Sequence, residues 1–396
     1  MQDGGLEDGQ AAAFKSFCDL LCGIFHYRMH KSLETLKDCY APFNPDIETT
    51  HIRSINDQQK IDYEKRLEQE LTTVLNQANF ERISEAEVNQ ALQQESLFRV
   101  KLHIDFNDFE EVLFFRRGVS RRSETLRTWF GLRKNDIEVT LYERVVIYVR
   151  FKDQEYFDRQ ERSELLFEPG TSLIKLFRNV PKNDLEMLFP NTEIRMKPID
   201  KLIIGVPTAI GGIFMLVTKV GSTLALVFAV IAFWLGIRSE PEPINQATLI
   251  ALAVGLGGLG GFLWRQFTKY KNRKIQFMKQ LAENLYHKNL DNNAGVFFNI
   301  IDAAEEEECK ETILAYYHLL TSKQSLDKNQ LDKNIEQWFS EKHQCDLNFE
   351  MEDAIQKLEQ LNLVTIEEHK YRAINIDQAN QILDKQWDEI FTFNNS

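Results

Sequence analysis

Four side chains that can bind a metal ion recur at a spacing of four residues near the N-terminus: Cys18, Cys22, His26 and His30. This spacing places them along one face of a helix, and thiolate and imidazole are the ligands that zinc prefers. About twelve residues of helix rise about 18 Å, whereas zinc ligands lie about 2.3 Å from the ion. The four therefore cannot hold one ion, and His26 and His30 would need ligands from elsewhere. We expect ordinary helix-face residues, without metal or cofactor.

The stretch at residues 116–134 is basic and contains a single acidic residue. Its candidate binding residues are cationic or aromatic: Arg116, Arg117, Arg121, Arg122, Arg127, Trp129, Arg133 and Lys134. One interpretation is a loop that contacts anionic lipid headgroups, with the aromatic side chains entering the interface. Another is a solvated hairpin connection, or an internal partner for an acidic C-terminal domain. Nucleic acid is disfavoured, because the chain has a net charge of -13 and a pI near 5.3.

No familiar catalytic motif accompanies these residues. The sequence has no Gly-rich phosphate loop, nucleophile elbow, His-Glu-x-x-His motif or paired-cysteine zinc spacing. Catalytic groups can be distant in sequence, so a membrane-bound enzyme stays an alternative. The five cysteines, an odd number, favour free thiols in a reducing compartment. We expect a non-enzymatic protein.

The elements that position these residues include two apolar segments. Lys219 is the only charged residue in the stretch 203–237, and the stretch 247–264 has none. A bilayer span needs roughly 20 apolar helical residues. We therefore predict a transmembrane helical hairpin, with a first span over about residues 216–237 and a second over 247–264. Three short spans, broken near Lys219, are the alternative.

Charge and small residues refine this prediction. Basic residues flank both ends of the apolar region, and the connecting loop is short and acidic, so both termini should be cytoplasmic. The expected location is integral in a bacterial inner membrane or an organelle membrane. Small residues recur every fourth position and suit close helix packing, of the hairpin on itself or in a homo-oligomer: Gly221, Ala225, Ala229, Gly257 and Gly261.

The rest of the chain has two kinds of pattern. Residues 12–40 and 61–78 have helical periodicity, whereas residues 98–104 and 137–151 alternate as strands do, which predicts an N-terminal α+β domain. After a basic helical stalk, residues 305–396 predict a helix opening on four glutamates, two further helices, a β-hairpin and a last helix. This is the order of a winged helix. Its third helix is acidic, so we expect it to bind protein and not DNA.

Several short motifs resemble the transmembrane protein 143-like family of uncharacterised membrane proteins. They are HYRMH at 26–30, FRRG at 115–118, ERVVIY at 143–148, LFRNVPKNDLEMLFP at 176–190 and LDKQW at 383–387, together with the apolar region from residue 203. The stretch 176–190 is the most specific. The resemblance implies two spans and a membrane location, and it implies no activity or site residues.

We therefore predict an α+β membrane protein with an N-terminal α+β domain (1–200), a two-span transmembrane hairpin (201–265), a basic stalk (266–304) and an acidic winged-helix-like domain (305–396). The predicted function is a membrane-anchored scaffold or regulatory protein, which recruits an unknown protein partner to an anionic membrane surface and binds lipids but no nucleic acid. A small-pore or accessory transport subunit, assembled through the Gly-rich spans, is the other alternative.

Overall fold

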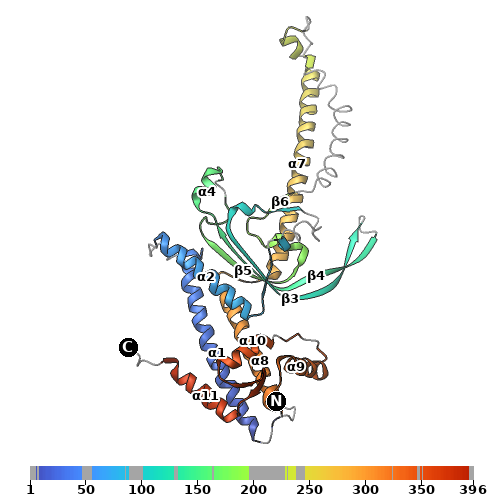
Figure 1. Cartoon of the computed structure of the whole chain (residues 1–396). Helices are drawn as coiled ribbons and strands as arrows, with labels where there is room; N and C mark the ends of the chain where they lie inside the picture. Colours follow the sequence, from blue (N-terminus) through green and yellow to red (C-terminus); the bar gives the residue numbers. More distant parts are fainter. Residues whose placement is uncertain are drawn as a thin grey trace. The chain divides into compact units, whose positions relative to one another are not determined.

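The structure of the chain, a computed structural model, describes residues 6, 9–46, 56–84, 86–88, 101–128, 133–162, 165–195, 228–229, 231–237, 246–322, 324–345, 348–349 and 351–391. The chain forms two compact units (Figure 1). Unit 1 comprises Met1–Ser84, Phe109–Asn179 and Asn289–Ser396. Unit 2 comprises Glu85–Asp108 and Val180–Lys288.

Unit 1 is built on three long helices and a sheet. The helices are α1 (Gln10–Tyr40), α2 (Asp57–Gln77) and α8 (Ala294–Thr321). The predicted helices at 12–40 and 61–78 are thus confirmed, and α2 begins earlier because Asn56 and Gln59 form a capping box. Short helices η1 (Ala41–Phe43) and α4 (Gln154–Arg159) also belong to this unit.

The five-stranded sheet has the order β1-β3-β4-β5-β7. Its strands are β1 (Glu81–Arg82), β3 (Phe109–Thr128), β4 (Arg133–Phe151), β5 (Ser172–Pro181) and β7 (Asn289–Asn292). The pairs β1–β3, β3–β4 and β5–β7 are antiparallel. The alternating segment at 137–151 is therefore a strand, as predicted, and the fold of this unit is α+β.

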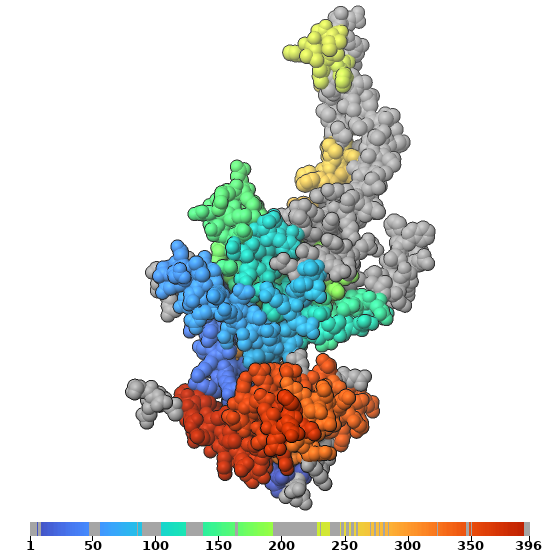
Figure 2. Space-filling view, in the orientation of Figure 1, coloured from blue at the N-terminus to red at the C-terminus, as the bar shows by residue number. Residues whose placement is uncertain are grey.

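The C-terminal residues add helices around α8. They form α9 (Lys328–His343), α10 (Met351–Gln360), the hairpin β8 (Val364–Glu367) and β9 (Lys370–Ala373), α11 (Ile376–Asp388) and η6 (Glu389–Phe391). Figure 2 shows these elements gathered in one rounded lobe. The expectation that a helix opens on Glu305 is wrong: α8 begins at Ala294, so the four glutamates lie in its middle.

Two apolar cores lie side by side in unit 1, and α1 and α8 run through both. The first core joins Phe14 to Phe25 of α1 with the C-terminal lobe, including Tyr316 of α8. The second joins Met29 to Tyr40 of α1 with α2, the sheet and the first turns of α8. Each long helix therefore buries a continuous apolar face in two successive environments.

Unit 2 contains the pair β2 (Lys101–His103) and β6 (Glu193–Arg195), the short helices η3 (Phe106–Asp108) and η4 (Lys182–Leu188), and the long helix α7 (Gln246–Lys288). Its buried polar centre is Asp108, which accepts a hydrogen bond from the amide of Asn191 at 3.0 Å. The Asn191 amide also donates to the carbonyl oxygen of Asp105.

The predicted membrane hairpin is contradicted. Among the residues described, no helix combines the length and apolar character needed to cross a bilayer. Most of the first predicted span, 216–237, lies outside those residues, and the second, 247–264, is the first part of α7. The absence of charge does not by itself make a helix apolar enough to span a bilayer. Residues 255–261 include five glycines, which add length without apolar side chains. Helix α7 also continues into the charged segment from Arg265. The fold class as an α+β membrane protein and the integral membrane location are corrected accordingly.

The structure describes only some of the small residues that we expect to pack the two helices of the hairpin together. Gly221 and Ala225 lie outside the described residues, whereas Ala229 is described. Gly257 and Gly261 lie on α7, and a Cβ added at either would meet no described atom within 4 Å. The described part of the chain therefore shows no close helix approach at these two glycines.

Candidate functional site

A two-stranded ribbon extends from the sheet of unit 1. Strands β3 and β4 stay paired from Phe109 and Phe151 to Thr128 and Arg133. The neighbouring β1 pairs only with Phe115 and Arg116, so beyond Arg116 the outer edge of β3 has no strand partner among the described residues. Figure 1 shows the two strands running on together past the other strands. Such an edge presents free backbone donors and acceptors.

The basic stretch expected to be a loop is thus mainly strand. Arg116 pairs with Glu81 at 2.8 Å and lies over the ring of Tyr142, and Arg117 pairs with Glu307 of α8 at 2.8 Å. Arg117 thus has an internal partner among the acidic residues of α8. Arg121 and Arg122 are exposed and make no ion pair with the residues that the structure describes. Arg127, Arg133 and Lys134 lie on the strands, but their side chains are outside the described residues. Trp129 lies wholly outside the described residues.

The four consecutive glutamates of α8 form the polar centre of unit 1. Successive helical residues point about 100° apart, so four in a row cover the whole circumference. Glu305 meets His26 of α1 at 2.9 Å, Glu306 meets Lys310 at 2.6 Å and Glu307 meets Arg117. Glu308 meets Lys357 of α10 at 3.0 Å. One turn of helix thereby joins α1, β3 and α10.

Lys357 is the buried cation of this centre. Its ammonium lies 2.9 Å from Glu311, 3.0 Å from Glu308 and 2.6 Å from Asp353, and the residue is 7% exposed. Burial lowers the pKa of Lys357, but the carboxylates of Glu308 and Glu311 outweigh it and raise the pKa above its usual value. Burial has the opposite effect on an acid, and it raises the pKa of Glu308 above its usual value. A polar cavity of about 220 Å³ adjoins this group.

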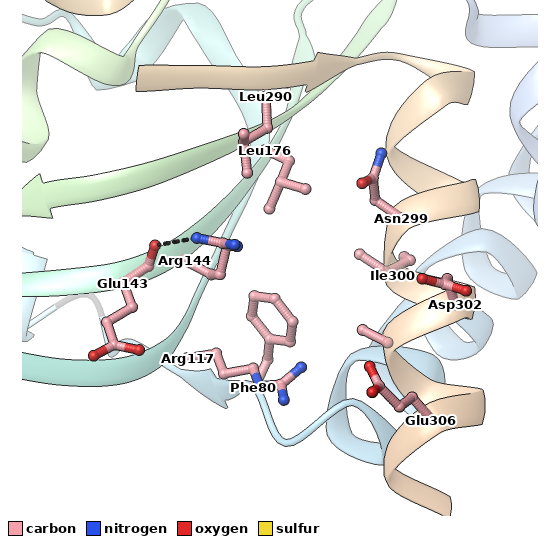
Figure 3. Close-up of a pocket in the computed structure, with 11 residues that line it drawn as sticks. Phe80, Arg117, Glu143, Arg144, Leu176, Leu290, Asn299, Ile300, Asp302 and Glu306 are labelled. Carbon is pink, nitrogen blue, oxygen red and sulfur yellow. Dashed lines mark hydrogen bonds between the residues drawn. The ribbon is translucent and has the colours of Figure 1, made fainter. Parts of the chain in front are cut away.

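A larger cleft lies on the other side of the glutamate turn, at the base of the ribbon. Its volume is about 460 Å³, and it opens between the sheet and α8 (Figure 3). The sheet contributes Arg117, Glu143 and Arg144, and α8 contributes Asn299, Asp302 and Glu306. The apolar lining comes from Phe80, Leu176, Leu290, Ile300 and Ala303. One wall is therefore mainly basic and the other acidic.

Two members of the Cys and His stripe of α1, Cys22 and His26, contact α8. Cys309 of α8 lowers the pKa of the Cys22 thiol, and His26 meets Glu305 one turn further along. Burial raises the pKa of Cys18 to about 12, and His30 is exposed. The described residues contain no group of three or more side chains able to hold a metal ion. The spacing of four thus reflects contact between two helices at Cys22 and His26.

Sequence reasoning missed the glutamate turn, Lys357 and the cleft. The run of four glutamates predicts a helix N-terminus, where a negative charge is favourable, and not the middle of α8 where the structure places it. The partners Arg117, His26 and Lys357 are far from it in the sequence, and Arg144 and Asp302 have no distinctive neighbours. Only long-range contacts bring these residues together.

Comparison with known proteins adds one match. A family model described as "Protein of unknown function (DUF3754)" matches residues 142–295, from β4 to the start of α8. The matched part is less than half of the chain and includes Glu143 and Arg144 of the cleft. No solved structure matches the chain. The resemblance to the transmembrane protein 143-like family stays a prediction.

Proposed function

We propose that this protein is a non-enzymatic scaffold or regulatory protein. The ribbon of β3 and β4 recruits a protein partner by binding an acidic, extended segment of that partner. The observation that carries the proposal is the outer edge of β3 beyond Arg116, which has no strand partner among the described residues and bears the exposed Arg121 and Arg122. An extended peptide can add to such an edge as a further strand.

The chemistry of the edge favours a short protein segment over a polyanion. The net charge of -13 opposes the approach of a nucleic acid or an anionic surface, which would meet the field of the whole chain. A short acidic peptide along β3 would feel chiefly the nearby arginines. Backbone hydrogen bonds would supply affinity, and the two guanidinium groups would select for carboxylates.

The test uses the full chain and a fluorescent synthetic peptide in which pairs of Glu alternate with pairs of Thr, because Arg121 and Arg122 are successive strand residues whose side chains lie on opposite faces. We expect the Arg121→Gln/Arg122→Gln variant to bind it about tenfold more weakly, since exposed charge pairs contribute up to ~1 kcal/mol each and ~1.4 kcal/mol is tenfold. The matched control is Lys370→Gln/Arg372→Gln, which removes two exposed charges from the β9 hairpin. Fluorescence anisotropy at low and physiological salt gives the affinities.

Three comparisons decide the class of partner. A peptide with Gln for Glu should bind weakly, and a backbone N-methylated copy, which keeps the charge but loses the donors, should also bind weakly. Anionic vesicles and duplex DNA should compete poorly. Equal losses in the ribbon and control variants, or tighter binding to vesicles or DNA than to the peptide, would overturn the proposal.

A further inference from the structure

We infer that the cleft between the sheet and α8 binds a small zwitterion with an apolar side chain, of the class of the free amino acids with large apolar or aromatic side chains. This inference goes beyond the proposed partner recruitment and does not depend on it, because it concerns different side chains. The cleft of about 460 Å³ has a volume typical of small-molecule pockets, which span about 300–1,000 Å³.

The charges of the cleft are arranged in two facing groups. In Figure 3 the Arg144 guanidinium projects from β4 into the space in front of α8, and the carboxylates of Asp302 and Glu306 lie on the helix side. Among the described residues, the Arg144 guanidinium donates a single hydrogen bond, to the carbonyl oxygen of Glu143 at 3.1 Å. Within the described part of the chain, neither Arg144 nor Asp302 has an ion-pair partner.

Three other polar groups around the cleft already have partners. Arg117 pairs with Glu307, Glu306 pairs with Lys310, and the amide of Asn299 donates to Asp291 at 2.8 Å. The Glu143 carboxylate lies over Gly118 and in Figure 3 points away from α8, so Arg144 and Asp302 are the groups left to bind a ligand. A guanidinium suits a carboxylate through two parallel hydrogen bonds, and a carboxylate suits an ammonium group.

The floor of the cleft is apolar and preformed. Phe80 is 5% exposed, Leu176 4% and Ile300 1%, so these side chains are fixed in the core and present only one surface to the cleft. An apolar or aromatic side chain of the ligand would bury apolar area against them, which favours binding. A ligand with both charges and an apolar group would use all three parts.

Other ligand classes fit less well. A phosphate-bearing ligand would meet the carboxylates of Asp302 and Glu306 at the opposite wall. A metal ion would need several carboxylate or imidazole ligands together, and the described residues provide no such group. A purely apolar ligand would leave Arg144 and Asp302 desolvated without a partner, which is unfavourable.

The experiment is calorimetric titration of the full chain with L-phenylalanine and three relatives that each lack one feature. Phenylpropionate lacks the ammonium, phenethylamine lacks the carboxylate, and glycine lacks the side chain. We expect L-phenylalanine to bind, and each relative to bind at least tenfold more weakly. Arg144→Gln and Asp302→Asn should each weaken L-phenylalanine binding by at least tenfold, whereas Lys370→Gln on the β9 hairpin should leave it unchanged.

A charge exchange keeps the test decisive. Arg144→Asp/Asp302→Arg should bind L-phenylalanine better than either single variant, because the two charges are restored in reversed order. Both residues are exposed, so circular dichroism should show that all variants keep the fold. Absence of L-phenylalanine binding to the folded protein, binding of phenylpropionate or phenethylamine as tight as that of L-phenylalanine, or unchanged affinity in both single variants would overturn the inference.

Discussion

At the scale of single residues, Lys357 shows how unit 1 tolerates carboxylates in its interior. Glu308 is 3% exposed and Glu311 6%, and both face the same ammonium group. Two buried carboxylates without a cation would repel each other and lose their hydration. The lysine is therefore a structural counter-ion that holds α10 to α8.

We predict that Lys357→Met destabilises the protein by about 3–5 kcal/mol, the usual cost of leaving buried charge unpaired. Urea unfolding followed by circular dichroism measures the change. The double variant Lys357→Met/Glu308→Leu should recover part of the loss, because it removes one of the carboxylates left without a partner.

The matched control is Lys328→Met. Lys328 also contacts a carboxylate, Glu352 at 2.6 Å, but its side chain is 38% exposed. Exposed pairs contribute at most ~1 kcal/mol, so this variant should change the free energy of unfolding little. Similar losses in the Lys357 and Lys328 variants would contradict the role assigned to the buried lysine.

At the scale of elements, the ribbon depends on one glycine. Gly118 of β3 has a φ of +69°, in the left-handed region that other residues adopt at a cost. It lies opposite Glu143 of β4, and a Cβ at Gly118 would come within 2.7 Å of a Glu143 carboxylate oxygen and 3.1 Å of its Cβ. The glycine thus allows β3 to bend while Glu143 packs over it.

We predict that Gly118→Ala destabilises unit 1 by more than the ~1–2 kcal/mol of the left-handed backbone alone. Gly170→Ala is the control, because Gly170 has a φ of +75° but no atom within 4 Å of an added Cβ. Replacing Glu143 by Ala in the Gly118→Ala background should remove the excess and leave the backbone cost. Thermal unfolding of the unmodified protein and the three variants measures the change. Equal losses of stability in Gly118→Ala and Gly170→Ala would refute this prediction.

At the scale of the whole molecule, unit 1 has two cores that share α1 and α8. Phe17 is 0% exposed and stacks on Tyr316 in the first core, with ring centroids 4.2 Å apart. Leu71 of α2 is 0% exposed in the second core. The C-terminal lobe therefore takes part of its core from residues near the N-terminus.

We predict that Phe17→Ala and Leu71→Ala, each at a cost of roughly 2–5 kcal/mol, loosen different parts of unit 1. Native-state hydrogen exchange should show faster exchange in α9, α10 and α11 for Phe17→Ala, and in α2 and the sheet for Leu71→Ala. Equal acceleration throughout unit 1 in both variants would show that the two cores unfold as one.

Much of the local structure could be predicted from the sequence. The periodicity of residues 12–40 predicts α1, the alternation at 137–151 predicts most of β4, and the patterns after residue 330 predict α9, α10 and the β8–β9 hairpin. These features depend on side chains a few residues apart, which one segment contains by itself.

Only the tertiary structure decided the candidate site. That the basic stretch is a ribbon and not a loop, that Glu307 meets Arg117, and that Arg144 faces the carboxylates of α8 all depend on residues far apart in the sequence. The charge-free stretches predicted a membrane hairpin that the described helices contradict. Local patterns specify which residues prefer burial or exposure, but long-range packing decides which charges meet and what each apolar face contacts.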